Sequence, residues 1–89
     1  MVNNRRSEIK IISEILHLSS QGAKKTELLY QGNFSYSQLQ SYLKYLIEKK
    51  IIEENKVEKS GTSVKYYKTT QKGLSLLQDV DKVIEQLKL

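Results

Sequence analysis

Residues 35–48 read SYSQLQSYLKYLIE. Ser35 precedes Gln38 by three residues, the spacing in which each side chain accepts a hydrogen bond from the other residue's backbone N–H at a helix start. The apolar residues that follow recur at helical spacing, so one face is apolar and the opposite face is polar. The segment predicts an amphipathic helix beginning at Tyr36, with an apolar arc of Leu39, Leu43 and Leu46, widened by Tyr36, Tyr42 and Ile47.

Two helices are predicted before this segment. The first runs from about Ser7 to Ser20 and ends before Gly22, because glycine tolerates the positive φ that often follows a last helical turn. The second is shorter, from Ala23 to Gln31, and ends at Gly32-Asn33. The stripe that marks the first helix contains Ile9, Ile12 and Leu16.

A hairpin and a last helix are predicted after Lys50. Residues that favour strands occur on both sides of the turn-forming cluster Lys59–Ser63. Thr70 is a plausible N-cap for a helix from Gln71 to Leu89, which would span roughly 28 Å. The strand-favouring residues are Ile51, Ile52 and Val57, then Val64, Tyr66, Tyr67 and Thr69.

The predicted fold class is mainly α with a two-stranded β-hairpin (α+β). The chain has 89 residues, enough for one hydrophobic core but not for two. We therefore expect a single domain, in which residues 1–72 form a DNA-binding unit and residues 73–89 add a C-terminal helix for dimerisation. With no Cys and one His, disulfides, thiolate metal sites and multi-His zinc sites are excluded, and we expect no cofactor and no metal.

Enzyme activity is not expected. His17 borders the apolar stripe of the first helix without a Ser or Asp partner evident in the sequence, so a partly buried structural histidine is the default interpretation. Asp79 and Asp81 lie two positions apart and point in different directions on a helix. The four glycines are scattered near the ends of predicted elements and form no phosphate-binding loop.

The charge balance favours an anionic partner. The formal net charge is +5, and the excess avoids the last helix, since residues 1–72 hold 13 basic and 7 acidic side chains and residues 73–89 hold 2 and 3. Nucleic acid and an acidic membrane face are both candidates, and charge alone does not choose between them. There is no apolar run of about 20 residues and no signal peptide pattern near the N-terminus. A cytoplasmic protein without membrane contact, associated with the nucleoid, is expected.

The second and third helices, followed by the hairpin, have the arrangement of a helix-turn-helix with a wing. The third helix would enter the major groove, where Gln can bridge adenine edges, Ser can donate or accept, and Lys can reach guanine or phosphate. An ordinary solvated helix face is the alternative for each residue taken singly. The candidates on this helix are Tyr36, Ser37, Gln40, Ser41 and Lys44.

Two further groups are candidates for backbone contacts. Lys24 and Lys25, at the start of the second helix, can bind phosphate with help from the N-terminal amides. The hairpin tip can lie along the backbone or enter the minor groove, although a solubilising turn would have the same composition. The tip candidates are Lys59, Ser60, Thr62 and Lys65.

The last helix carries a short seam typical of a coiled coil. Apolar residues follow a 3-4-3 spacing, which suits pairing with a second copy of the chain. Packing onto the chain's own body is the alternative. The seam residues are Leu77, Val80, Ile84 and Leu87.

Several stretches are similar to archaeal winged-helix DNA-binding proteins: GAKKTELLY at residues 22–30, NFSYSQL at 33–39 followed by Tyr42-Leu43, and YKTTQKGL at 67–74. The resemblance covers about residues 7–77. It implies that the helix after Ser35 is the recognition helix, that residues 59–65 are the wing and that the last helix is the dimer contact. Members include small basic chromatin proteins and transcription regulators. The last helix here is shorter than in the coiled-coil chromatin members.

The expected function is double-stranded DNA binding by a homodimer, as a transcription regulator or a chromatin protein. The alternative is a protein-protein interaction module of the same fold, since winged-helix folds host both roles. An effector ligand has no signature in the sequence.

Overall fold

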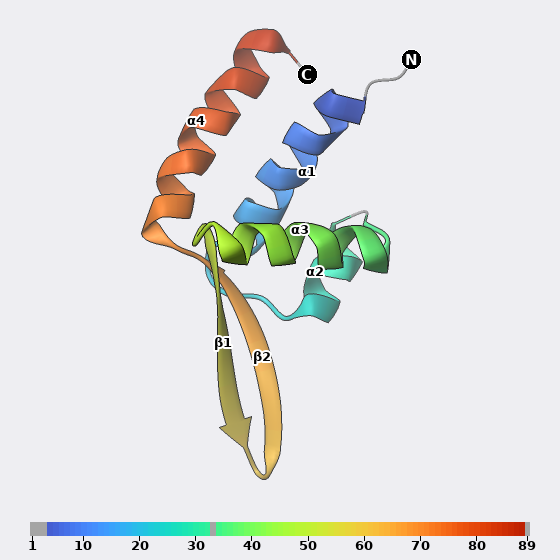
Figure 1. Cartoon of the computed structure of the whole chain (residues 1–89), viewed down its shortest axis with the longest axis vertical. Helices are drawn as coiled ribbons and strands as arrows, with labels where there is room; N and C mark the ends of the chain where they lie inside the picture. Colours follow the sequence, from blue (N-terminus) through green and yellow to red (C-terminus); the bar gives the residue numbers. More distant parts are fainter. Residues whose placement is uncertain (1–3, 33, 89) are drawn as a thin grey trace.

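Across residues 4–32 and 34–88, which the computed structural model describes, the chain forms four helices and one two-stranded antiparallel sheet (Figure 1). This is the predicted order, and the α+β fold class is confirmed. Asn33, predicted at the end of the second helix, lies outside the described residues. The elements are α1 (Asn4–Leu18), α2 (Lys25–Gln31), α3 (Tyr36–Glu48), β1 (Ile52–Lys59), β2 (Thr62–Thr69) and α4 (Gln71–Leu87).

Ser35 and Thr70 cap α3 and α4 as predicted, but of the two reciprocal bonds expected between Ser35 and Gln38 the described residues show only the one accepted by Ser35. The Ser35 hydroxyl accepts a hydrogen bond from the backbone N–H of Gln38 at 3.2 Å, and the Thr70 hydroxyl accepts one from Gly73 at 3.0 Å. These bonds satisfy N–H groups that have no partner within the first turn of a helix. Both helices accordingly begin at the predicted residue, Tyr36 for α3 and Gln71 for α4.

The α2 helix begins two residues later than predicted, because Ala23 is used by the sheet. Its backbone N–H donates to the Tyr67 carbonyl at 2.9 Å, and the Tyr67 N–H donates back at 2.7 Å. Ala23 thus forms a single antiparallel bridge with Tyr67 of β2. For this reason α2 starts only at Lys25. The first helix also ends before Ser20, at Leu18, and the chain turns through Gly22, whose φ is +94°.

The hydrophobic core lies where α1, α2 and α3 meet the base of the hairpin and the start of α4. The Thr69 hydroxyl, itself buried, donates to the Leu16 carbonyl at 2.8 Å and ties β2 to the end of α1. Only the apolar face of α3 packs against this core, and its polar face remains exposed. The fully buried aliphatic side chains of the core are Ile15, Leu16, Leu28, Leu39, Leu46 and Ile52.

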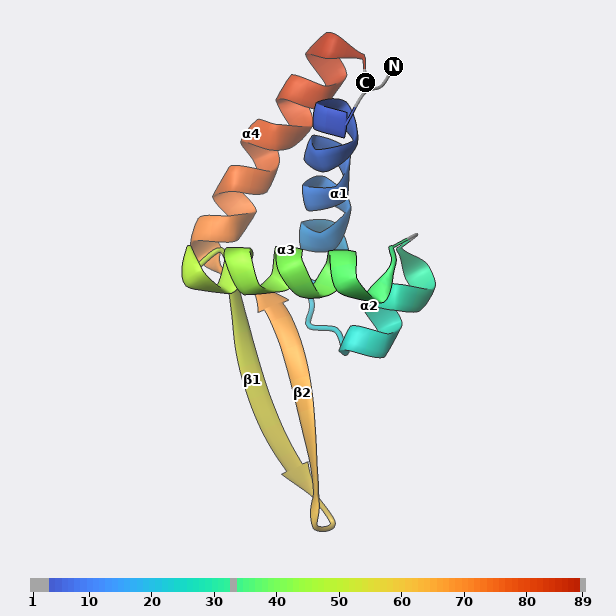
Figure 2. The same ribbon diagram turned by 45° about the vertical axis from the view of Figure 1, so that its right-hand side comes forward.

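The hairpin projects away from the helices, with only its base packed against them (Figure 2). Ser60 and Gly61 form the two-residue turn with φ of 50° and 79°, as expected for a tight hairpin turn that follows the strand twist. The register pairs Ile52 with Thr69 and Lys59 with Thr62. Residues 53–63 are all exposed, so the tip is free to contact a partner.

Helices α1 and α4 lie together at the end of the molecule opposite the hairpin (Figures 1 and 2). Leu77, predicted in the dimer seam, is only 6% exposed and belongs to the chain's own core. For this residue the intramolecular alternative holds, because the first turns of α4 pack against the body. Val80 and Ile84 are half-buried, and Leu87 is 62% exposed.

His17 was predicted to be a partly buried structural histidine, and the prediction of its burial was wrong. Its side chain is 58% exposed and its Nε2 lies 2.7 Å from Asp81 Oδ2. The other oxygen, Oδ1, accepts a 2.7 Å hydrogen bond from Ser13. The sequence could not indicate this cluster, because the helices that bring these residues together lie far apart in the chain.

Candidate nucleic-acid interface

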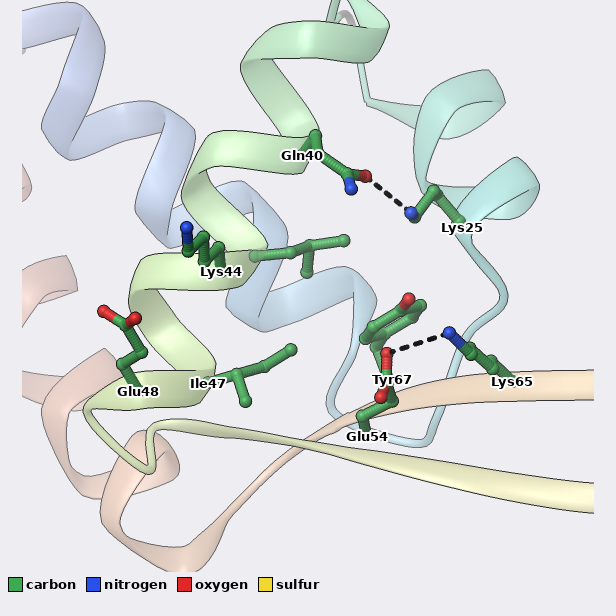
Figure 3. Close-up of a pocket in the computed structure, with 9 residues that line it drawn as sticks. Lys25, Gln40, Lys44, Ile47, Glu48, Glu54, Lys65 and Tyr67 are labelled. Carbon is green, nitrogen blue, oxygen red and sulfur yellow. Dashed lines mark hydrogen bonds and ion pairs between the residues drawn. The ribbon is translucent and has the colours of Figure 1, made fainter.

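The free face of α3 carries the predicted contact residues. Ser37, Gln40, Ser41 and Lys44 are all exposed, and Tyr36, at the first turn, is 59% exposed. Gln40 and Lys44 border the cleft between α3 and the hairpin (Figure 3). Ser41 borders a different hollow, which Glu8 and Ile12 of α1 also line. The free face of α3 is thus polar and exposed to solvent.

A cleft of about 280 Å³ separates α3 from the base of the hairpin (Figure 3). Leu43, Ile47 and Tyr67 supply its apolar part. Three cations and two carboxylates from α2, α3 and both strands surround it together with Gln40. The charged residues are Lys25, Lys44, Lys65, Glu48 and Glu54.

Lys25 lies at the centre of these contacts. Its Nζ donates to Gln40 Oε1 at 2.6 Å and sits 5.4 Å from the centroid of the Tyr36 ring and 5.9 Å from that of Tyr67. A cation at such distances from ring faces is attracted by the π-electron density. The neighbouring Lys24 is exposed, so the two lysines predicted together occupy different environments.

Glu54 partly offsets the positive charge of the cleft. Its carboxylate lies 3.8 Å from the Lys65 ammonium. Burial and the nearby Glu54 carboxylate raise the pKa of Tyr67 to about 12. Residues 52–69 hold four lysines and three glutamates, which makes the hairpin less basic as a whole than its tip composition indicates.

The hairpin register separates the tip candidates onto two sides. Directly paired residues share a face and neighbouring pairs alternate, so Lys59 and Thr62 lie on the side opposite to Lys65. Lys59, Ser60, Thr62 and Lys65 are all exposed. They are therefore available to a partner that wraps the hairpin, and they do not form one flat surface.

Lys56 is a cation that the sequence reasoning missed. It pairs directly with Lys65 across the strands, an arrangement that is destabilising in the absence of a counter-charge. A two-residue turn at Ser60-Gly61 would have implied this pairing. The Glu54 carboxylate, 3.8 Å from the Lys65 ammonium, supplies such a counter-charge.

The described residues contain no group of three or more His, Cys, Asp or Glu side chains that could hold a metal ion. None of the helices described by the structure is long and apolar enough to cross a membrane. The Ser13–Asp81–His17 cluster lies between α1 and α4. Because Ser13 contacts the carboxylate and not the imidazole, the cluster lacks the arrangement of an activated nucleophile.

Residues 5–88 match a protein-family model described as winged helix-turn-helix. An uncharacterised protein of Methanocaldococcus jannaschii, MJ0287, is 34% identical over 53 residues, which cover 58% of this chain and 55% of that protein. The chain thus spans about half the length of this curated relative. Its archaeal source agrees with the archaeal resemblance noted in the sequence, over a limited stretch.

Two solved structures share the fold. A PadR family transcriptional regulator from Eggerthella lenta superposes with a TM-score of 0.80 at 18% identity, covering 94% of this chain and 79% of the other. A PadR-like transcription factor of Bacteroides fragilis gives a TM-score of 0.75 at 22% identity, covering 97% and 88%. At these identities the similarity is one of fold.

Proposed function

Because the chain belongs to the winged helix-turn-helix family, we propose that it binds double-stranded DNA as a homodimeric transcription regulator. The observation that carries this proposal is the free polar face of α3 beside a projecting hairpin with exposed lysines. A helix fits the major groove, where such side chains reach base edges and phosphates. The two proteins of similar fold are named as a transcriptional regulator and a transcription factor, which favours a regulator over a chromatin protein.

The proposal assigns a role to each group of residues. Residues on α3 read the major groove, whereas the lysines of α2 and the hairpin contact phosphates or the minor groove. Residues 1–72 then form the DNA-binding part, and residues 73–89 the dimerisation helix of the same domain. No catalytic step and no cofactor is required, and the nucleoid in the cytoplasm would be the site of action.

The dimer part of the proposal rests on apolar side chains of α4 that the chain leaves uncovered. Val83 is 42% exposed and Leu87 is 62% exposed, next to the half-buried Val80 and Ile84. A second copy would bury them and place two recognition helices on one duplex. In a two-fold dimer, half-sites should lie about 34 Å apart or a multiple of it.

The test is titration of a fluorescent duplex at several salt concentrations. Affinity should fall steeply with salt, because lysines that displace counterions supply most of the non-specific binding. Lys44→Ala should weaken binding to all duplexes and reduce the salt slope by about 1 if Lys44 contacts a phosphate. Lys82→Ala is the matched control, since it removes an exposed lysine from α4. It should change neither the affinity for DNA nor the salt slope.

The opposite result would favour the protein-interaction module. If no duplex is bound at low salt, or if binding does not respond to salt, the electrostatic account fails. One set of titrations on the intact chain thus distinguishes DNA binding from a protein-interaction function.

A further inference from the structure

The hydrogen bond between Lys25 and Gln40 fixes which way the Gln40 amide faces. An ammonium is a donor with no acceptor capacity, so the Gln40 atom 2.6 Å from Lys25 Nζ must be the carbonyl oxygen Oε1. The amide NH₂ is thereby left as the group available to an outside partner (Figure 3). Gln40 is exposed, so that NH₂ is accessible.

The position of the Lys25 ammonium is itself constrained. It sits near the rings of Tyr36 and Tyr67, and the Lys25 side chain is half-buried, unlike that of Lys24. Tyr67 is buried, and its backbone is held by two hydrogen bonds to Ala23. These contacts with α3 and β2 make Lys25 a positioning residue for Gln40. Of the two lysines proposed as phosphate contacts at the start of α2, the exposed Lys24 then keeps that role.

This arrangement bears on base recognition. A glutamine reads adenine by accepting from N6 and donating to N7, and so needs both ends of its amide. Guanine offers two acceptors, N7 and O6, to the major groove. Lys25 takes one of the two lone pairs of Oε1. Its ammonium also stands beside the other lone pair, where it disfavours the adenine amino group, itself a donor, and favours the acceptors of guanine.

We propose that Lys25 sets the base preference of Gln40, so that the pair selects guanine over adenine at one position of each half-site. This inference rests on the proposed function, since it names the sequence preference of the same DNA interface. Without Lys25, the Gln40 amide is free to turn, and its complete donor–acceptor edge suits adenine. A glutamine considered by itself would be expected to contact adenine. We expect that contact for a variant that lacks Lys25 and not for the natural chain.

The experiment selects duplexes from a random pool with the natural chain, Lys25→Met, Lys25→Arg and Gln40→Ala. Lys24→Met is the matched control. It removes the same charge at the neighbouring position, where the lysine side chain is exposed. Binding constants are then measured for two duplexes that differ only by guanine or adenine at the position whose preference Gln40→Ala abolishes. Circular dichroism checks that each variant keeps its helices.

The natural chain should favour guanine at that position by about tenfold, the order expected for a well-formed pair of hydrogen bonds to a base. Lys25→Met should reverse or abolish this ratio, and Lys25→Arg, which still donates, should keep it. Lys24→Met should lower affinity for both duplexes equally and leave the ratio unchanged.

Two results would overturn the inference alone: Lys25→Met keeps the guanine preference, or the natural chain prefers adenine at the position that depends on Gln40. In both, the chain still binds DNA with the expected salt dependence. Absence of DNA binding by the natural chain at low salt would instead overturn the proposed function, and this inference with it.

Discussion

Asp81 joins the two helices at the end of the molecule opposite the hairpin. Its carboxylate accepts hydrogen bonds of 2.7 Å from both Ser13 and His17, and because a carboxylate only accepts, the His17 Nε2 carries the proton in that bond. Burial alone would raise the pKa of Asp81, but the hydrogen bonds from Ser13 and His17, with the charge of His17, lower it below its ordinary value. The folded state therefore favours the ionised carboxylate.

Asp81→Ala should reduce the free energy of unfolding at pH 7 by about 1 kcal/mol, the usual contribution of a partly exposed hydrogen-bonded group. A carboxyl group whose pKa is lowered on folding stabilises the protein above its unfolded value, near 3.9. That stabilisation is lost as the pH falls through the lower folded value. Urea unfolding should thus show a smaller difference between variant and natural chain at pH 3 than at pH 7.

Asp79→Ala is the control, since Asp79 is an exposed acid on the same helix. It should change stability by less than about 0.5 kcal/mol at either pH. An equal loss for the two substitutions at pH 7 would contradict the role assigned to the Asp81 hydrogen bonds.

At the scale of elements, the start of α4 depends on a glycine for space. Gly73 is buried, and a Cβ built there would collide with the Ile51 carbonyl oxygen and lie 2.6 Å from the Thr69 methyl carbon. The close approach lets the Thr70 hydroxyl cap the helix while also donating to the Lys50 carbonyl at 2.7 Å. The junction of β2 and α4 is therefore set by packing against the turn that joins α3 to β1.

Gly73→Ala should destabilise the chain by about 1–3 kcal/mol, the usual cost of overpacking a tight site. This is opposite in sign to the gain of about 1 kcal/mol that alanine gives over glycine in an exposed helix. Ser75→Ala, at an exposed position of α4, should be neutral or slightly stabilising. Thermal unfolding of the three proteins decides the matter, and a higher melting temperature for Gly73→Ala would refute the steric argument.

At the scale of the whole molecule, the proposed dimer contacts lie at one end of a body measuring 47 × 26 × 21 Å. The proposed DNA contacts extend from its middle, where α3 lies, to the hairpin at the other end (Figure 1). The hairpin occupies one end and the paired helices α1 and α4 the other (Figure 1). A second copy bound through α4 would leave both hairpins and both α3 faces uncovered.

Sedimentation should find a dimer of the natural chain, and Val83→Lys with Leu87→Lys should shift it to a monomer, because charges cannot be buried without a partner. Val57→Lys is the control, since Val57 is similarly exposed, at 39%, but lies on the hairpin. DNA affinity should fall with the loss of the dimer, as each molecule then binds a single half-site. A natural chain that sediments as a monomer at micromolar concentration would contradict the dimer.

The sequence by itself determined the order of the elements, the starts of α3 and α4 and the exposed face of α3. Helical spacing and capping act between residues three or four positions apart, so they are legible in a linear chain. Only the tertiary structure decided the start of α2 at Lys25, the burial of Leu77, the partner of His17 and the contact between Lys25 and Gln40. Each of these depends on the packing of elements far apart in sequence, and local spacing carries no information on which of them meet.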